Sequence, residues 1–85
     1  MGGVIVVFRV MPEGVEVDLD KIKDEIEKKI KPQKIEKVPI AFGLSALKVT
    51  KLVPEKSGAI EDLEKTVKSI DGVSGFDVLE VSRSL

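Results

Sequence analysis

Five carboxylates stand close together in the first third of the chain, and such a group is the first candidate for chemistry. Oxygen ligands of this kind bind hard cations such as Mg²⁺ and Ca²⁺. Lysines alternate with these acids, however, and carboxylates at the start of a helix interact favourably with the helix dipole. We therefore interpret the cluster as part of a helix and predict no metal site. Its members are Asp18, Asp20, Asp24, Glu25 and Glu27.

The side chains most often used for catalysis are missing from the 85 residues. The chain has no histidine and no cysteine, which removes the commonest general base, the thiolate nucleophile and any disulfide. Its glycines form no phosphate-binding loop. Asp71 and Asp77 flank a turn, and we interpret them as structural. We predict no catalytic residue and no cofactor.

Charge and hydropathy exclude further classes of function. Fourteen basic and fifteen acidic residues nearly cancel, so no overall field attracts nucleic acid or an anionic membrane. No apolar run approaches the roughly 20 residues of a membrane span. The start, MGGVIVVFRV, lacks the basic region of a signal peptide. We expect one domain over residues 1–85, in the cytoplasm.

Two features resist a purely structural interpretation. Phe42, one of three aromatic residues, stands beside Gly43 between two strand-like segments. Large apolar residues are usually avoided at an exposed turn unless they are used. From the residues alone, a lid over the core and a partner contact both remain open for Phe42. The second feature is the terminal VSRSL, which leaves almost no tail after the last predicted strand, with an idle chain end as the alternative.

Hydrophobic periodicity predicts the elements that position these features. Alternating apolar residues predict strands, and a period of 3.6 predicts helices. Asp18 is the expected cap of the first helix, which Pro32 ends. Pro39 has no amide to donate, so its strand is expected at a sheet edge. The predicted strands cover residues 4–11, 34–42, 44–53 and 76–83, and the second helix lies near residues 58–70.

The order β-α-β-β-α-β favours an α+β, ferredoxin-like sandwich, because crossover connections are right-handed. We predict a four-stranded antiparallel sheet in the order 4-1-3-2, with both helices on one face. This order places the apolar first strand inside. It also places the Phe42–Gly43 turn and the C-terminus at opposite ends of the sheet, about 25 Å apart at roughly 3.3 Å per residue.

This fold alone leaves several functions open. An RNA-binding sheet would need aromatic residues on its central strands, where Phe8, expected in the core, is the one aromatic residue. A free-standing regulatory domain that binds a small ligand stays open as the alternative. Ile5, Val7 and Ala46 are expected on the open sheet face, where an apolar patch would favour weak dimerisation. We expect a monomer or a weak dimer.

The run PIAFGLSALKV, residues 39–49, resembles archaeal translation elongation factor 1-beta, a family similar to the exchange domain of the eukaryotic factor. RVMPEG, VDLDKIKDEI and DGVSGFDVLEVSR extend the resemblance nearly end to end. The resemblance implies exchange of GDP for GTP on the GTPase elongation factor 1-alpha. It implies an activity through binding, without enzymatic chemistry.

The resemblance also implies a contact at the hairpin tip. In the eukaryotic relatives, the Phe of the Phe-Gly hairpin touches the second domain of the GTPase. That position is Phe42 here, flanked by Ala41 and Gly43. We therefore expect these three residues to bind the partner.

A second contact is implied at the C-terminal end, which in the relatives probes the magnesium and phosphate site of the GTPase. The relatives use a Lys one residue before the end, where this chain has Ser84. The nearest cation is Arg83, and arginine is not equivalent to lysine at a compact ion site. Arg83, Ser84 and Leu85 are the expected contacts. Because the tip and this end are far apart, we expect them to grip two different domains.

Overall fold

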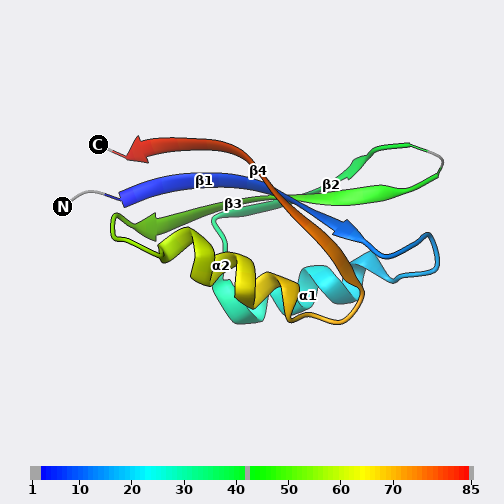
Figure 1. Ribbon diagram of the computed structural model, residues 1–85. Helices are drawn as coiled ribbons and strands as arrows, with labels where there is room; N and C mark the ends of the chain where they lie inside the picture. The colour runs from blue at the N-terminus through cyan, green and yellow to red at the C-terminus, as the bar shows by residue number, and fades with distance from the viewer. Residues whose placement is uncertain (1–2, 42, 85) are drawn as a thin grey trace.

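The computed structural model describes residues 3–41 and 43–84. Figure 1 shows a long twisted sheet with two helices beneath it. The elements follow the predicted order β-α-β-β-α-β. They are β1 (Gly3–Pro12), α1 (Leu19–Ile30), β2 (Lys34–Pro39), β3 (Ser45–Pro54), α2 (Ala59–Lys68) and β4 (Val73–Ser84).

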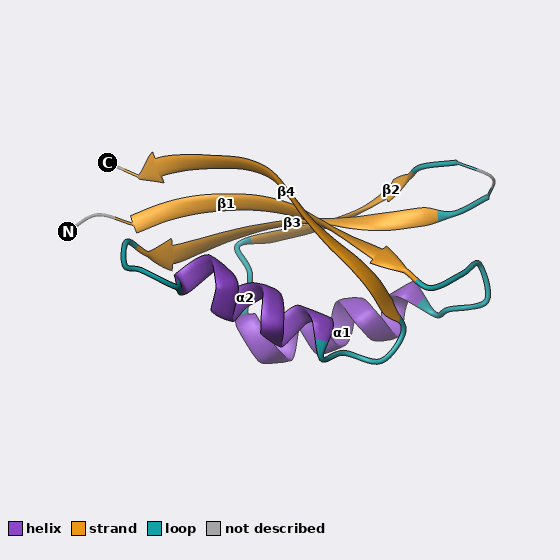
Figure 2. Ribbon diagram, in the orientation of Figure 1, coloured by secondary structure: helices purple, strands orange, loops and turns teal. Residues whose placement is uncertain are grey.

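The sheet has the strand order β2-β3-β1-β4, and every neighbouring pair is antiparallel. This is the predicted 4-1-3-2 order, and both helices lie on one face (Figure 2). β2, which ends at Pro39, lies at an edge as predicted. β1 and β3 are the inner strands, so the predicted position of the apolar first strand is confirmed.

The core lies between β1, β3 and the two helices. Phe8 projects from the middle of β1 and is fully buried, as predicted. Its ring packs against that of Phe76 in β4, with 4.6 Å between the ring centroids. Burying a side chain of this size stabilises the fold by about 1.5–3 kcal/mol. The other fully or nearly fully buried members are Val6, Val10, Ile22, Ile26, Leu47, Val49, Val53, Leu63, Val67 and Ile70.

Local signals fix the ends of the helices. The Asp18 side chain accepts a hydrogen bond from the backbone amide of Asp20 at 3.0 Å, which confirms the predicted N-cap. After α2, which ends at Lys68, the chain turns at Gly72, whose φ of +93° lies in the left-handed region that favours glycine. A Cβ atom at Gly72 would lie 2.9 Å from a Val17 methyl group, so packing as well as conformation selects glycine there.

The structure corrects three details of the sequence analysis. β2 ends at Pro39 instead of extending to residue 42, because the chain turns directly after it. β4 begins at Val73 and not at Phe76. Ala46 is fully buried and is not part of an exposed apolar patch. It lies on the inner strand β3, directly opposite Val38 of β2.

Neither helix of the described residues is long and apolar enough to cross a membrane.

Candidate functional site

The β2–β3 connection is a tight turn at one end of the sheet. The backbone amide of Leu44 donates to the carbonyl oxygen of Ala41 at 2.8 Å. The amide of Ile40 donates to the carbonyl oxygen of Leu44 at 3.0 Å. These bonds fold the chain back between the two strands and leave Ala41 and Gly43 exposed. The turn can therefore present its side chains to a partner.

Gly43 is required in this turn for its backbone conformation. Its φ is +77°, a region that side-chain-bearing residues rarely adopt. A Cβ atom there would meet no heavy atom within 4 Å, so space does not select glycine. Phe42 lies outside the residues that the structure describes, and its interpretation as a partner contact stays a prediction.

Replacing Gly43 with alanine should lower the free energy of unfolding by about 1 kcal/mol, because the left-handed conformation costs a Cβ-bearing residue that much. For a domain of this size, that loss lowers the melting temperature by roughly 4–8 °C. Thermal unfolding followed by circular dichroism measures the shift.

Two other glycines calibrate the measurement. Gly58 also has a positive φ, +85°, and open space around its Cβ position, so Gly58→Ala should cost about as much. Gly72→Ala should cost more, because strain adds to the close approach of Val17. An unchanged melting temperature for Gly43→Ala would show that the turn does not need a left-handed residue.

The last residues of β4 lie at the other end of the sheet. Arg83 is paired with Val4, and Ser84 with Gly3, at the first residues of β1. A guanidinium nitrogen of Arg83 is 2.6 Å from a carboxylate oxygen of Glu55, in the connection between β3 and α2. Leu85 lies outside the described residues, so its predicted role stays a prediction.

A β-bulge decides which face of the sheet Arg83 occupies. Phe8 is opposite Val78, whereas the preceding residue, Val7, is opposite Glu80, so β4 holds one extra residue between them. Directly opposed residues share a face, and Val4 lies on the same face as buried Phe8 because the two are four residues apart on one strand. Arg83 therefore projects on the helix side of the sheet. Uninterrupted alternation from Val78 would have placed Arg83 on the open face.

The hairpin tip and the end of β4 lie at opposite ends of the molecule (Figure 1). β3 separates them with ten residues, or about 30 Å at roughly 3.3 Å per residue. The molecule extends 42 Å along its longest axis. The strand register agrees with this separation. Ser45, at one end of β3, lies beside the hairpin tip, and Pro54, at the other end, is paired with Gly3 at the start of β1. The two candidate contacts cannot form one pocket.

Sequence reasoning missed two residues at these ends. Glu55 is one of fifteen acidic residues, and nothing in the sequence relates it to Arg83. Val15, in the loop between β1 and α1, is 68% exposed. Together with Gly43 and Leu44 it lines a hollow of about 280 Å³ beside the hairpin. An apolar residue between acids in the loop EGVE was the available signal for Val15.

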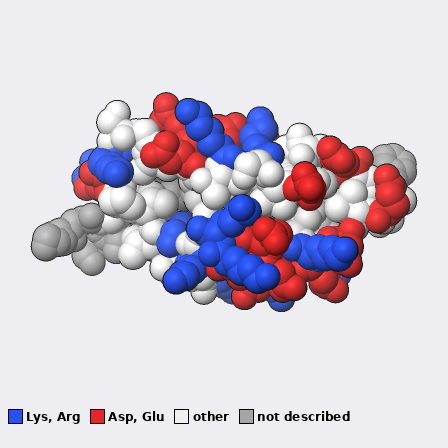
Figure 3. All heavy atoms as spheres, turned by 90° about the horizontal axis from the view of Figure 1, so that it is seen from below, with Lys and Arg blue, Asp and Glu red and all other residues white. Residues whose placement is uncertain are grey.

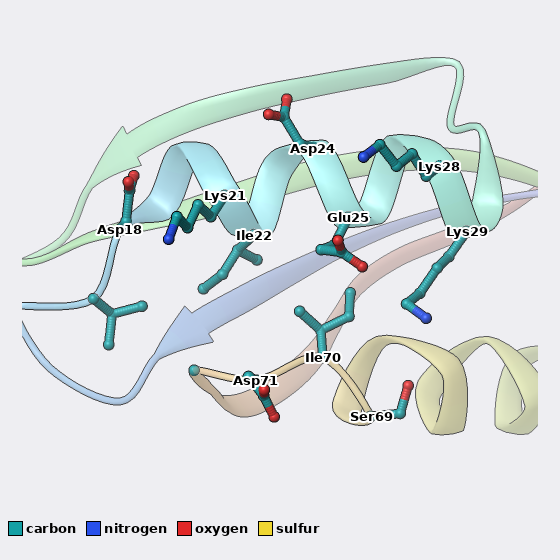
Figure 4. Close-up of a pocket in the computed structure, with 12 residues that line it drawn as sticks. Asp18, Lys21, Ile22, Asp24, Glu25, Lys28, Lys29, Ser69, Ile70 and Asp71 are labelled. Carbon is teal, nitrogen blue, oxygen red and sulfur yellow. The ribbon is translucent and has the colours of Figure 1, made fainter.

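A hollow of about 700 Å³ lies between α1 and the segment that follows α2. In Figure 4, Ile22 and Ile70 point toward each other there, and both belong to the core. Charged side chains of both signs form the rim, among them Lys21, Lys29 and Glu25. This mixture favours a solvated groove over a site for one charged ligand.

The five acidic residues of the first third of the chain lie on α1 or at its N-cap, as interpreted from the sequence. Asp18 caps α1, and Asp20 forms a salt bridge with Lys37 at 3.8 Å. Within residues 3–41 and 43–84, no three acidic side chains come close enough to hold a metal ion. On the helical side, Figure 3 shows acidic and basic groups interspersed. Neither sign forms a large area of its own on that surface.

Comparison with known protein families first defines the class of domain. Residues 5–83 match the model of the EF-1 guanine nucleotide exchange domain. The match begins in β1 and ends at Arg83 in β4, so it includes both ends of the sheet described above.

Individual relatives agree with that class. The chain is 41% identical to elongation factor 1-beta of Methanothermobacter thermautotrophicus, with 98% of each chain covered. It is 43% identical to elongation factor 1-beta of Metallosphaera sedula, covering 98% of this chain and 97% of the relative. The elongation factor 1-beta of Methanoculleus marisnigri is 36% identical, covering 94% of this chain and 95% of the relative. The chain belongs to the elongation factor 1-beta family, and its role is in translation elongation.

Proposed function

We propose that this protein accelerates the exchange of GDP for GTP on elongation factor 1-alpha by gripping two domains of that GTPase. Membership of the exchange-domain family supports the class of activity. Residues 1–85 then act as one exchange domain, as a monomer or weak dimer in the cytoplasm, where translation takes place.

The observation that carries the proposal is the placement of two candidate contacts at opposite ends of one sheet. The hairpin tip with Ala41 and Gly43 lies at one end, and Arg83 lies at the other. The strands between them are hydrogen-bonded along their length and packed on a buried core, so the separation is fixed. A rigid body of this kind can hold two domains of a partner at a defined distance.

The mechanism requires only differential binding. An exchange factor that binds the nucleotide-free GTPase more tightly than the GDP-bound form must, by linkage, weaken the binding of GDP. The hairpin tip would supply affinity by anchoring the second domain. The end of β4 would then act near the phosphates and magnesium ion of the nucleotide-binding domain. No covalent bond changes, so no acid, base or nucleophile is needed.

Arg83 takes the place of the near-terminal cation in this proposal. It is 78% exposed, so its guanidinium is available to a partner. A guanidinium is planar and presents several donors, whereas an ammonium is a compact point charge. We propose that Arg83 acts on oxygen atoms around the nucleotide site and not by occupying a compact ion position.

A GDP-release assay tests the proposal. The cognate elongation factor 1-alpha is loaded with fluorescent GDP, and release into excess unlabelled GTP is followed with and without this protein. We expect the release rate to rise with protein concentration and then to saturate. Release at the spontaneous rate under saturating protein would overturn the proposal. A small ligand that raised the melting temperature of the free protein would instead favour a regulatory domain.

A further inference from the structure

We infer that Glu55 is a positioning residue for exchange, and that it holds Arg83 in the place from which Arg83 acts on the GTPase. The inference rests on the function proposed above. Glu55 lies in the connection between β3 and α2, outside both the hairpin tip and the end of β4.

The contact joins parts of the chain that are far apart in sequence. The nitrogen–oxygen distance of 2.6 Å is the shortest among the salt bridges of the described residues. Val4 of β1 lies directly between the two elements, because it is paired with Arg83 on one side and with Val53 on the other. The contact between Arg83 and Glu55 therefore spans β1, and it ties the edge strand β4 to the connection that follows β3.

Glu55 also lies on the wall of a hollow at this end of the molecule. The hollow has a volume of about 300 Å³, and its apolar lining includes Val4, Val53 and Ile60. The guanidinium bonded to Glu55 is thus held beside a largely apolar depression. An approaching partner meets a cation in one defined place there, and not a long side chain that samples many positions.

Stability does not explain this contact well. Arg83 is 78% exposed and Glu55 38% exposed, and exposed ion pairs contribute little to folding. Arginine has many rotamers, however, and an unrestrained arginine loses this freedom when it binds. A carboxylate that restrains the side chain beforehand reduces that entropic cost. The pair therefore fits a role in pre-organising Arg83 better than a role in holding the fold.

Glu55→Gln tests the inference, because it keeps the size of the side chain and removes its charge. We expect the maximum rate of GDP release to fall about two- to tenfold, the range that corresponds to ordering one long side chain on binding. The concentration that gives the half-maximal rate should change little, as should the melting temperature. Glu55→Asp keeps the carboxylate and should recover part of the rate.

A double-mutant cycle separates positioning from an independent effect of Glu55. In an Arg83→Gln background, Glu55→Gln should have no further effect, because the cation that it positions is gone. Glu64→Gln is the matched control: Glu64 is also in a surface salt bridge, with Lys68 at 3.6 Å, but lies on α2. That variant should exchange at the wild-type rate.

The outcomes distinguish this inference from the proposed function. If the wild-type protein accelerates GDP release and Glu55→Gln is equally fast, the positioning role is wrong and the function stands. The role is also wrong if Glu55→Gln is faster, since the pair would then sequester Arg83, or if the two substitutions have independent effects. If the wild-type protein leaves GDP release unchanged, both the function and the positioning role are wrong.

Discussion

Deleting Arg83 to Leu85 is expected to lower the maximum rate of GDP release about tenfold to a hundredfold. Hydrogen bonds to charged groups contribute about 1.5–3 kcal/mol, and each 1.4 kcal/mol changes a rate by a factor of about ten. The protein concentration at the half-maximal rate should change much less, because the hairpin tip still anchors the partner. Stopped-flow release of fluorescent GDP over a range of protein concentrations measures both quantities.

Point variants control for damage to the sheet. Deletion also removes the pairing of Arg83 with Val4 and of Ser84 with Gly3, which can fray the end of β1. Arg83→Gln keeps this backbone pairing and should reproduce most of the loss in rate. Arg83→Lys keeps the charge without the planar group, so its maximum rate should lie between those of Arg83→Gln and the wild-type protein. Equal losses in rate and affinity would contradict a role at the nucleotide site.

Phe42→Ala is expected to weaken binding to elongation factor 1-alpha about thirtyfold, which corresponds to roughly 2 kcal/mol. Aromatic residues that enter a partner's surface often dominate the energy of an interface. If Phe42 is such an anchor, the maximum rate should be largely retained at saturating concentrations. Titration calorimetry with the nucleotide-free GTPase gives the affinity.

Phe8→Ala is the informative comparison for Phe42→Ala. Phe8 is fully buried, and removing a buried phenylalanine usually costs about 3–5 kcal/mol of stability. Phe42→Ala should leave the melting temperature nearly unchanged. A large decrease in the melting temperature of Phe42→Ala would instead show that Phe42 covers the core, and the partner contact would be wrong.

The two ends are expected to act independently. Substitutions that share no contact and lie more than about 10 Å apart usually have additive effects. Phe42→Ala should raise the half-saturating concentration, and Arg83→Gln should lower the maximum rate. The double variant should show both changes, each with its own magnitude. A strong interaction between the two changes would argue against a rigid body that holds two separate domains.

Most of the fold could be predicted from local patterns. The apolar run of residues 4–11 indicated the strand β1, and the segment between Asp18 and Pro32 indicated the helix α1, in which Ile22 and Ile26 are buried. Pro39 indicated an edge strand because proline cannot donate to a ladder. The boundaries were less accurate. β4 begins three residues before the predicted start at Phe76, because its pairing with β1 extends to Val73.

The candidate site could be predicted only in part. Gly43 was recognisable because the turn needs a residue that tolerates positive φ. Arg83 was recognisable from its place near the end of the chain and from the family resemblance. The burial of Ala46 was not recognisable, because it depends on the packing of the folded sheet and not on the pattern of its own segment.

The sequence by itself determined the elements, their order and the opposite placement of the hairpin tip and the end of β4. These follow from residue periodicity and from the handedness of connections. Only the tertiary structure decided the face on which Arg83 lies and the carboxylate that it meets. Both depend on the one extra residue in β4, which moves Arg83 to the side of Glu55. A bulge reverses the alternation of side chains, and its position is fixed by the pairing with β1.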